Sequence, residues 1–336
     1  MRGRAAAGSP AARGRAALLA LWVALYACAS PGTGPAEIVH IPPGTTLRGV
    51  ADSLAAHGVI RSRWWFSLLA RVGGHARRLQ SGTYAFQRGA GGAVAVRAIA
   101  AGRALLSRFT VPEGFTLLDM AEVAERQLGL PRSEFLAAAR DTALLREYAV
   151  PSGVGSFEGF LMPETYLFAK GTPAEAIVRE LAATFRSAWD PAWAEAGLAQ
   201  GLDQLAIVTL GSIIEGEARA DSERPLIAAV YRNRLKLGMA LQADATVQYA
   251  IQRATGQRKT RLYEKDYGFP SPYNTYLHPG LPPGPVGAPS RASLAAVVAP
   301  APVPYLYYVA GPDGRHIFSR SYAEHLRAVA RVRRAR

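Results

Sequence analysis

The chain has 336 residues, of which 49% are apolar and 19% charged, and its formal net charge is +14. This length suits an anchor followed by about two domains, and the composition excludes both wholesale disorder and a protein with many membrane spans. Its single cysteine, Cys28, excludes an internal disulfide framework and a cysteine-based metal site. The six histidines show no H-x-x-x-H or H-E-x-x-H pairing, so we expect no metal.

The positive charge is concentrated at the two ends of the chain. A basic balance favours anionic partners such as nucleic acid, lipid head groups or an acidic wall polymer, and does not choose between them. The sequence has no zinc-ligand spacing, no basic region leading into heptads and no aromatic-rich RNA-binding signature, so nucleic acid is not an expected partner. The terminal arginines are Arg2, Arg4, Arg13, Arg15, Arg331, Arg333, Arg334 and Arg336.

The amino terminus has the pattern of an export or anchoring signal. Its arginines run into the apolar residues 16–27, and the first acidic residue is Glu37. Positive charge before the apolar run predicts that everything after it is translocated, so the folded part should face the cell envelope. We expect residues 1–36 to form an N-terminal membrane anchor and linker.

The kind of anchor has two alternatives. The apolar run is shorter than the roughly 20 residues of a full span, but its uncharged continuation could lengthen it into an uncleaved transmembrane helix. Alternatively, residues 25–28 form a lipoprotein cleavage site and Cys28 is lipidated. The span is favoured because Tyr26 is an unusual residue for that site. A buried helix of a cytoplasmic protein is the third and least favoured interpretation.

An internal similarity follows the linker. Residues 41–51 resemble residues 111–121 without a gap, and both have the pattern of a strand, a Pro-x-Gly turn, a threonine and a helix. Proline and glycine form the turn, and Thr46 or Thr116 is positioned to cap the helix that follows. The pattern predicts two small β-α units, although such turns also recur by chance.

The remaining pattern predicts an α+β fold. Strand-like alternation, helical periodicity and Pro-Gly-rich loops follow one another along the chain, and a hairpin turn is expected near its end. The expected elements are a strand at 82–86, helices at 93–101, 132–148, 173–195 and 202–237, loops at 268–290, and strands at 305–309 and 316–318.

Residues 210–218 are the most informative segment, because carboxylates follow directly on an apolar helix. Partial burial should raise the pKa of a glutamate there, as a general acid working near neutral pH requires. On a helix, Glu215 shares its face with the small residues Gly211 and Ser212, which should leave room for a substrate.

Periodicity does not by itself select Glu215. Glu217 lies over Leu210, Ile213 and Ile214 on the same helix, and Glu223 is near in sequence. A helix end that carries solvated acids would show the same pattern. The choice among these carboxylates therefore needs information from the rest of the chain.

Residues 211–218 and six further segments supply that information, and together they span most of residues 37–330. On them, the chain resembles the endolytic murein transglycosylases of the MltG (YceG-like) family. In that family the catalytic glutamate follows Ser-Ile-Ile or a close variant, which corresponds to Glu215. The segments are residues 158–166, 211–218, 222–224, 230–249, 272–276, 280–286 and 304–309.

The resemblance implies an anchor in the bacterial inner membrane and two domains on its envelope side. Residues 37–108 would form a small module similar to the sugar-binding LysM domain. Residues 109–336 would form a lysozyme-like, mainly helical catalytic domain with a C-terminal β hairpin. The short apolar run and Cys28 depart from the usual family pattern, which affects the mode of anchoring and not the chemistry.

The resemblance also implies the reaction. An endolytic lytic transglycosylase cleaves the MurNAc-GlcNAc β-1,4 bond of peptidoglycan and leaves a 1,6-anhydroMurNAc end, terminating or trimming nascent strands. Glu215 would act as both acid and base, while the substrate's own C6 hydroxyl replaces water, so no cofactor is expected. The alternatives are a noncatalytic wall-binding protein and a water-using muramidase in which Glu217 or Glu223 is the second carboxylate.

Six residues in the quoted segments have side chains suited to a sugar, because they offer hydrogen bonds to hydroxyl and acetamido groups or rings that pack on sugar faces. Glu158 and Asn274 lie among turn-forming residues and could instead tie loops down. The expected partners are peptidoglycan strands, the membrane and peptidoglycan synthases that the sequence does not specify. The six candidate contacts are Glu158, Gln242, Asp244, Tyr273, Asn274 and Tyr276.

Overall fold

The computed structural model describes residues 35–335. The predicted anchor and Cys28 therefore lie outside the described residues, and within 35–335 no helix is both long and apolar enough to cross a membrane. The chain divides into two compact units. The first contains the described residues up to Ser107 together with Leu167–Thr172, and the second contains Arg108–Tyr166 together with the described residues from Pro173 onward.

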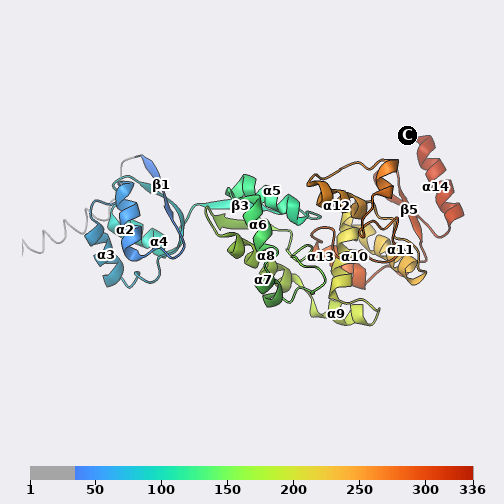
Figure 1. Cartoon of the computed structure of the whole chain (residues 1–336), viewed down its shortest axis with the longest axis horizontal. Helices are drawn as coiled ribbons and strands as arrows, with labels where there is room; N and C mark the ends of the chain where they lie inside the picture. Colours follow the sequence, from blue (N-terminus) through green and yellow to red (C-terminus); the bar gives the residue numbers. More distant parts are fainter. Residues whose placement is uncertain (1–34, 336) are drawn as a thin grey trace, which may run out of the picture. The chain divides into compact units, whose positions relative to one another are not determined.

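The first unit is built on one antiparallel strand pair and three helices (Figure 1). Ile41 of the first strand lies opposite Gly82 of the second. Val39, Leu54 and Phe66 are buried in a common core, which draws on both strands and all three helices. The predicted strands and the helix near 93–101 are confirmed. The elements are β1 (Ala36–Ile41), α2 (Leu47–Ala56), α3 (Arg63–Val72), β2 (Gly82–Gln87) and α4 (Gly92–Ala100).

The second unit is mainly helical (Figure 1). Its α-helices are α5 (Leu117–Leu128), α6 (Arg132–Ala138), α7 (Thr142–Glu147), α8 (Ala174–Ala188), α9 (Pro191–Leu198), α10 (Gln204–Glu217), α11 (Arg224–Lys236), α12 (Asp244–Thr255), α13 (Arg291–Val298) and α14 (Tyr322–Ala335). Two 3₁₀ turns, η1 (Asp221–Glu223) and η2 (Glu264–Gly268), lie between them. Strand β3 (Leu106–Thr110) pairs with β4 (Thr165–Ala169), and β5 (Tyr307–Ala310) pairs with β6 (His316–Ser319) in the predicted hairpin.

Helix α10 is the central helix of the second unit. Every residue from Ile207 to Ile214 is buried, and α10 contacts α9, α11, α12 and α13. A helix that is apolar on all sides has to be surrounded in this way. The polar residues at the C-terminal end of α10 therefore lie among the helices that surround it.

The α+β class is confirmed, but the three long helices that the sequence predicted after Pro131 are each broken in two. The break in 173–195 comes before Pro191, which occupies the first turn of α9, while Asp190 caps that helix. Pro225 likewise occupies the first turn of α11. Proline lacks the amide that a continuing helix needs, so it begins a new helix. Helices α3, α12, α13 and α14 and strand β4 were not predicted.

Both copies of the internal repeat fold as predicted. The hydroxyls of Thr46 and Thr116 each accept a hydrogen bond of 3.2 Å from the amide three residues ahead, which caps α2 and α5. The turn glycines Gly44 and Gly114 have φ of 75° and 73°, a left-handed conformation that glycine adopts without steric cost. The two β-α units are thus the same local structure.

Candidate active site

The carboxylate of Glu215 is the meeting point of three elements. Its side chain is 5% exposed, and Oε1 accepts a hydrogen bond of 2.8 Å from Arg224 Nη2 on α11. Oε2 accepts one of 2.8 Å from the backbone amide of Ser290 and another from the Ser290 hydroxyl. Ser290 is the N-cap of α13, so Glu215 also lies at a helix N-terminus, which favours negative charge.

These contacts change the expected electrostatics of Glu215. Burial acts to raise its pKa, but hydrogen bonds from Ser290, Ser293 and Arg224 favour the ionised form and together hold the pKa below its ordinary value. The expectation of a raised pKa at Glu215 is therefore wrong for this arrangement. The sequence did not indicate that Ser290, from a distant loop, would donate twice to the carboxylate.

Arg224 links Glu215 to two further acids. Its Nη2 lies 3.5 Å from Glu113 Oε2, its Nη1 pairs with Asp221, and its Nε donates a 2.9 Å hydrogen bond to Ser293 Oγ. Glu113 belongs to the turn of the second repeat copy. Arg224 was in a quoted motif without an assigned role, and sequence reasoning gave no role to Ser290 or Glu113.

The turn of the second copy packs directly against this site. The amide of Gly114 donates a 2.8 Å hydrogen bond to the carbonyl of Ala288, and the amide of Ala288 donates one of 2.8 Å to the carbonyl of Phe115. A Cβ added to Gly114 would lie 3.9 Å from Glu215 Cγ, whereas one added to Gly287 would lie 2.7 Å from the Gly114 carbonyl oxygen. Only glycine at 287 permits this approach.

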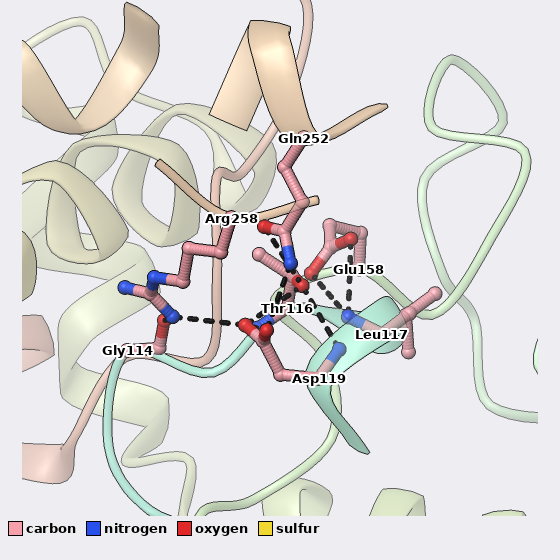
Figure 2. A network of polar contacts seen from close by, with 7 residues as sticks. All are labelled: Gly114, Thr116, Leu117, Asp119, Glu158, Gln252 and Arg258. Atoms are coloured by element: carbon pink, nitrogen blue, oxygen red, sulfur yellow. Dashed lines mark hydrogen bonds and ion pairs between the residues drawn. The ribbon is translucent and has the colours of Figure 1, made fainter. Parts of the chain in front are cut away.

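A polar network holds the same turn from its other side, as Figure 2 shows. Asp119 accepts hydrogen bonds of 3.0 Å from the Thr116 amide, 2.8 Å from Gln252 Nε2 and 2.8 Å from Arg258 Nη1. Arg258 also reaches the Gly114 carbonyl at 3.4 Å. The start of α5 is thereby fixed to α12 and to the loop that follows α12.

Glu158, one of the six candidate contacts, lies beside the start of α5 (Figure 2). Its carboxyl oxygens accept the Leu117 amide at 3.2 and 3.3 Å and the Tyr249 hydroxyl at 3.3 Å. Burial raises the pKa of Glu158 to about 8, although the Leu117 amide opposes the shift. In this arrangement its partners are all groups of the protein, and its contact with a substrate stays a prediction.

A small pocket of about 40 Å³ opens beside the part of α10 that carries Ser212 and Gly216. Ser212 and Gly216 line it, together with Gly114, Tyr249 and Arg258. Of the two small residues expected to leave room, Ser212 lines the pocket and Gly211 does not, whereas Gly216 was not predicted. A Cβ on Gly211 would lie 3.1 Å from Leu294, so this glycine accommodates α13.

Glu217, the rival carboxylate, lies in a second polar cluster. Its Oε2 accepts a 3.1 Å hydrogen bond from the hydroxyl of Tyr308, which is itself 2.6 Å from the hydroxyl of Tyr231. Burial, followed by the charge of Asp244, raises the pKa of Glu217 to about 7. By pKa alone Glu217 suits a general acid better than Glu215 does, and structural networks also produce such shifts.

Comparisons with known proteins identify the family. The model of the YceG-like family matches residues 39–331. The chain belongs to the YceG-like family. This confirms the resemblance inferred from the sequence motifs.

Two relatives of this YceG-like protein carry the name endolytic murein transglycosylase. The Bacillus subtilis protein is 29% identical over 304 residues, which cover 86% of this chain and 83% of that protein. The Streptococcus pneumoniae serotype 2 protein is 27% identical over 319 residues, which cover 87% of this chain but 57% of that protein. A crystal structure of a YceG-like protein from Listeria monocytogenes matches with a TM-score of 0.60 at 28% identity, covering 88% of this chain and 100% of that one.

Asn274 supports a loop in this YceG-like protein. Its Nδ2 donates hydrogen bonds of 2.9 Å to the carbonyls of Tyr267 and Phe269, and its Oδ1 accepts the Tyr276 amide at 3.0 Å. The residue is 0% exposed. It therefore has no free surface from which to reach a ligand here, and it positions Tyr276.

The other candidate contacts differ in exposure. The Tyr276 hydroxyl donates a 2.6 Å hydrogen bond to Asp244 Oδ1 at the start of α12, and the Tyr273 ring packs on Tyr249, with centroids 4.9 Å apart. Gln242 is exposed and has a φ of 50°, an uncommon conformation for a residue with a side chain.

Within residues 35–335, no three His, Cys, Asp or Glu side chains are grouped so as to hold a metal ion.

Proposed function

We propose that the protein is an endolytic peptidoglycan lytic transglycosylase and that Glu215 is its catalytic acid and base. Membership of the YceG-like family and the names of the relatives support the activity. The observation that carries the site is the convergence of Arg224, Ser290 and the second-copy turn on one buried carboxylate beside a pocket.

The proposed reaction needs one carboxyl group. Protonated Glu215 donates its proton to the glycosidic oxygen as the bond to MurNAc C1 breaks, and the C6 hydroxyl of the same sugar attacks C1. Ionised Glu215 then takes the proton of that hydroxyl, so a 1,6-anhydro end forms and the carboxyl is restored. Ser290 and Arg224 stabilise the ionised form between these two steps. Intramolecular attack avoids the entropic cost of positioning water.

The substrate is proposed to be the MurNAc-GlcNAc β-1,4 bond of a glycan strand. Tyr249, Gln248 and Arg258 line the pocket and offer a ring, an amide and a cation to a sugar. The exposed Gln242 and the Asp244–Tyr276 pair remain candidate contacts. A left-handed backbone at Gln242 is the kind of strain that is often found at binding sites.

We also propose that residues 37–108 form a LysM-like sugar-binding module and that residues 109–336 form the catalytic domain. The order strand, helix, helix, strand in the first unit supports this, as does an open groove there lined by Pro42, Gly44, Gln80 and Ser81. Peptidoglycan synthases are proposed as partners, because trimming nascent strands requires access to them.

An inner-membrane location with the catalytic domain in the periplasm remains our proposal for the signal-like amino terminus. Labelling cells with a radioactive fatty acid distinguishes the two kinds of anchor. A retained span predicts no lipid incorporation and unchanged membrane attachment in Cys28→Ala. Incorporation that disappears in Cys28→Ala would instead establish a lipoprotein.

Product analysis tests the function directly. Detergent-solubilised full-length protein is incubated with sacculi in water labelled with oxygen-18, and the released ends are identified by mass. We expect 1,6-anhydro ends without the label, and a metal chelator should change little. Reducing ends that carry oxygen-18 would indicate a muramidase, and the absence of any new ends would favour a noncatalytic wall-binding protein.

A further inference from the structure

The hydrogen bonds of Glu215 affect the proton that it must donate. Arg224 and the amide and hydroxyl of Ser290 all donate hydrogen bonds to it. Donors and a cation favour a carboxylate over a carboxylic acid. A general acid has to begin the reaction with a proton, so a second group has to hold it while Glu215 is ionised.

Glu113 is a carboxyl group in the right place. Arg224 Nη2 lies 2.8 Å from Glu215 Oε1 and 3.5 Å from Glu113 Oε2, so the two acids share one guanidinium nitrogen. Two carboxyls this close do not ionise independently, and their protons belong to the pair. The Glu113 side chain is 54% exposed, so it can exchange protons with water.

The charges around Glu113 favour its protonation. Burial and then the charge of Glu215 raise the pKa of Glu113, Asp221 adds to this, and Arg224 opposes it. The pKa of Glu215 shifts in the opposite direction. Glu215 is thus held in its ionised form, and Glu113 is the acid of the pair that carries the proton more readily.

The turn itself does not need this carboxyl. The first copy has Pro43 where the second has Glu113, and both turns close with the same amide-to-carbonyl bond, of 3.3 and 3.4 Å. Gly44 and Gly114 also have nearly the same φ. The backbone of the second turn is fixed by Ala288 and Arg258, so the position of Glu113 is set by contacts other than its own side chain.

We propose that Glu113 is a positioning residue that acts through Glu215, holding the proton of a shared acid pair and supplying it when substrate binds. The inference rests on the proposed function. In the step, Glu113 gives its proton to Glu215 and becomes ionised, and Glu215 passes a proton to the glycosidic oxygen. After Glu215 has taken the C6 hydroxyl proton, it returns a proton to Glu113, so the pair ends with the single proton with which it began.

The test compares pH–rate profiles of full-length variants on labelled glycan strands. Glu113→Gln and Glu113→Pro, which copies the first turn, should lower kcat about 10- to 100-fold with little change in KM. In these two variants the rate should begin to fall at a lower pH than in wild type, because Glu215 must then hold the proton alone. Glu113→Asp should restore part of the rate and the pH at which the rate begins to fall. Glu122→Gln, which changes an exposed acid on α5, is the control and should behave as wild type.

The outcomes separate this inference from the function on which it rests. If Glu113→Gln keeps the wild-type rate, or loses rate with an unmoved alkaline limb, the shared pair is wrong. If Glu215→Gln keeps its activity, the proposed active site fails instead. Circular dichroism of each variant verifies that the fold is intact, and Glu113→Pro and Glu113→Gln should agree because they remove the same carboxyl in different ways.

Discussion

The two copies of the strand-turn-helix motif have the same backbone but different surroundings. In the first copy, the hydroxyl of Thr45 donates a 2.6 Å hydrogen bond to the carbonyl of Pro42, so the turn is satisfied by itself and lines an open groove. In the second copy, the turn bonds to Ala288 and lies against Glu215. A local motif can thus be used twice, and what packs on it decides its role.

One position shows how the copies diverged. Three residues after the capping threonine, the first copy has Gly49 and the second has Asp119. Asp119 completes a capping box and also bonds Gln252 and Arg258, so the helix start is tied to other elements. Gly49 has no side chain, and a Cβ there would lie 2.9 Å from Thr45 Cγ2. The second copy is therefore fixed from both sides.

The variant with the largest expected effect on the cleavage rate tests whether the second copy of the motif lies at the catalytic centre. Glu215→Gln should lower the cleavage rate about a thousandfold or more with the fold intact, because the amide keeps the shape of the carboxyl but cannot cycle a proton. Glu217→Gln on the same helix should lose less. Rates on purified glycan strands decide this, and a dead Glu217→Gln beside an active Glu215→Gln would reverse the assignment.

A matched pair of glycine substitutions sharpens the comparison between the two turns. Gly287→Ala should reduce activity about 100-fold, because its Cβ meets the Gly114 carbonyl oxygen and displaces the second turn from Glu215. Gly44→Ala has open space around its Cβ, so it should cost about 1 kcal/mol of stability through its φ and leave kcat unchanged. Equal rates for the two variants would mean that the turn contact does not matter for catalysis.

The smallest expected effect is a change in the free energy of unfolding with pH. Burial raises the pKa of Glu158 in the folded state. Between the ordinary glutamate pKa and this raised value, folding takes up a proton, so ionisation of Glu158 destabilises the folded state. The stabilising contribution is complete below the ordinary glutamate pKa and is lost as pH rises toward about 8, by up to about 1.4 kcal/mol per pH unit. Denaturant unfolding across this window should show the slope in wild type and a smaller one in Glu158→Gln. An unchanged slope would show that Glu158 does not carry it.

Part of this slope should survive in Glu158→Gln. The pKa of Glu217 is also raised, to about 7, and contributes with the same sign. The double variant Glu158→Gln, Glu217→Gln should therefore flatten the dependence further. This separates the acid beside α5 from the acid at the end of α10.

The elements that sequence reasoning found were those with strong local signals. The repeat, the hairpin and the apolar α10 all show regular patterns within one segment. The long helices were predicted unbroken because periodicity continues across short gaps, and Pro191 and Pro225 were not weighed as helix starts. Helix α12, which supplies Gln252 and Tyr249, was missed although its first half, up to Tyr249, belongs to a quoted motif.

The sequence by itself determined the two capped turns, the helix carrying Glu215 and the family resemblance, because hydrogen bonds between near neighbours and a continuous motif depend on adjacent residues. Only the tertiary structure decided which groups surround Glu215. Ser290 donates from 75 residues away, and the second turn reaches the site through Ala288. Such contacts form when separate helices bury their apolar faces together, and the hydrogen bonds that they bring to Glu215 outweigh its burial and lower its pKa, contrary to the expectation from the sequence.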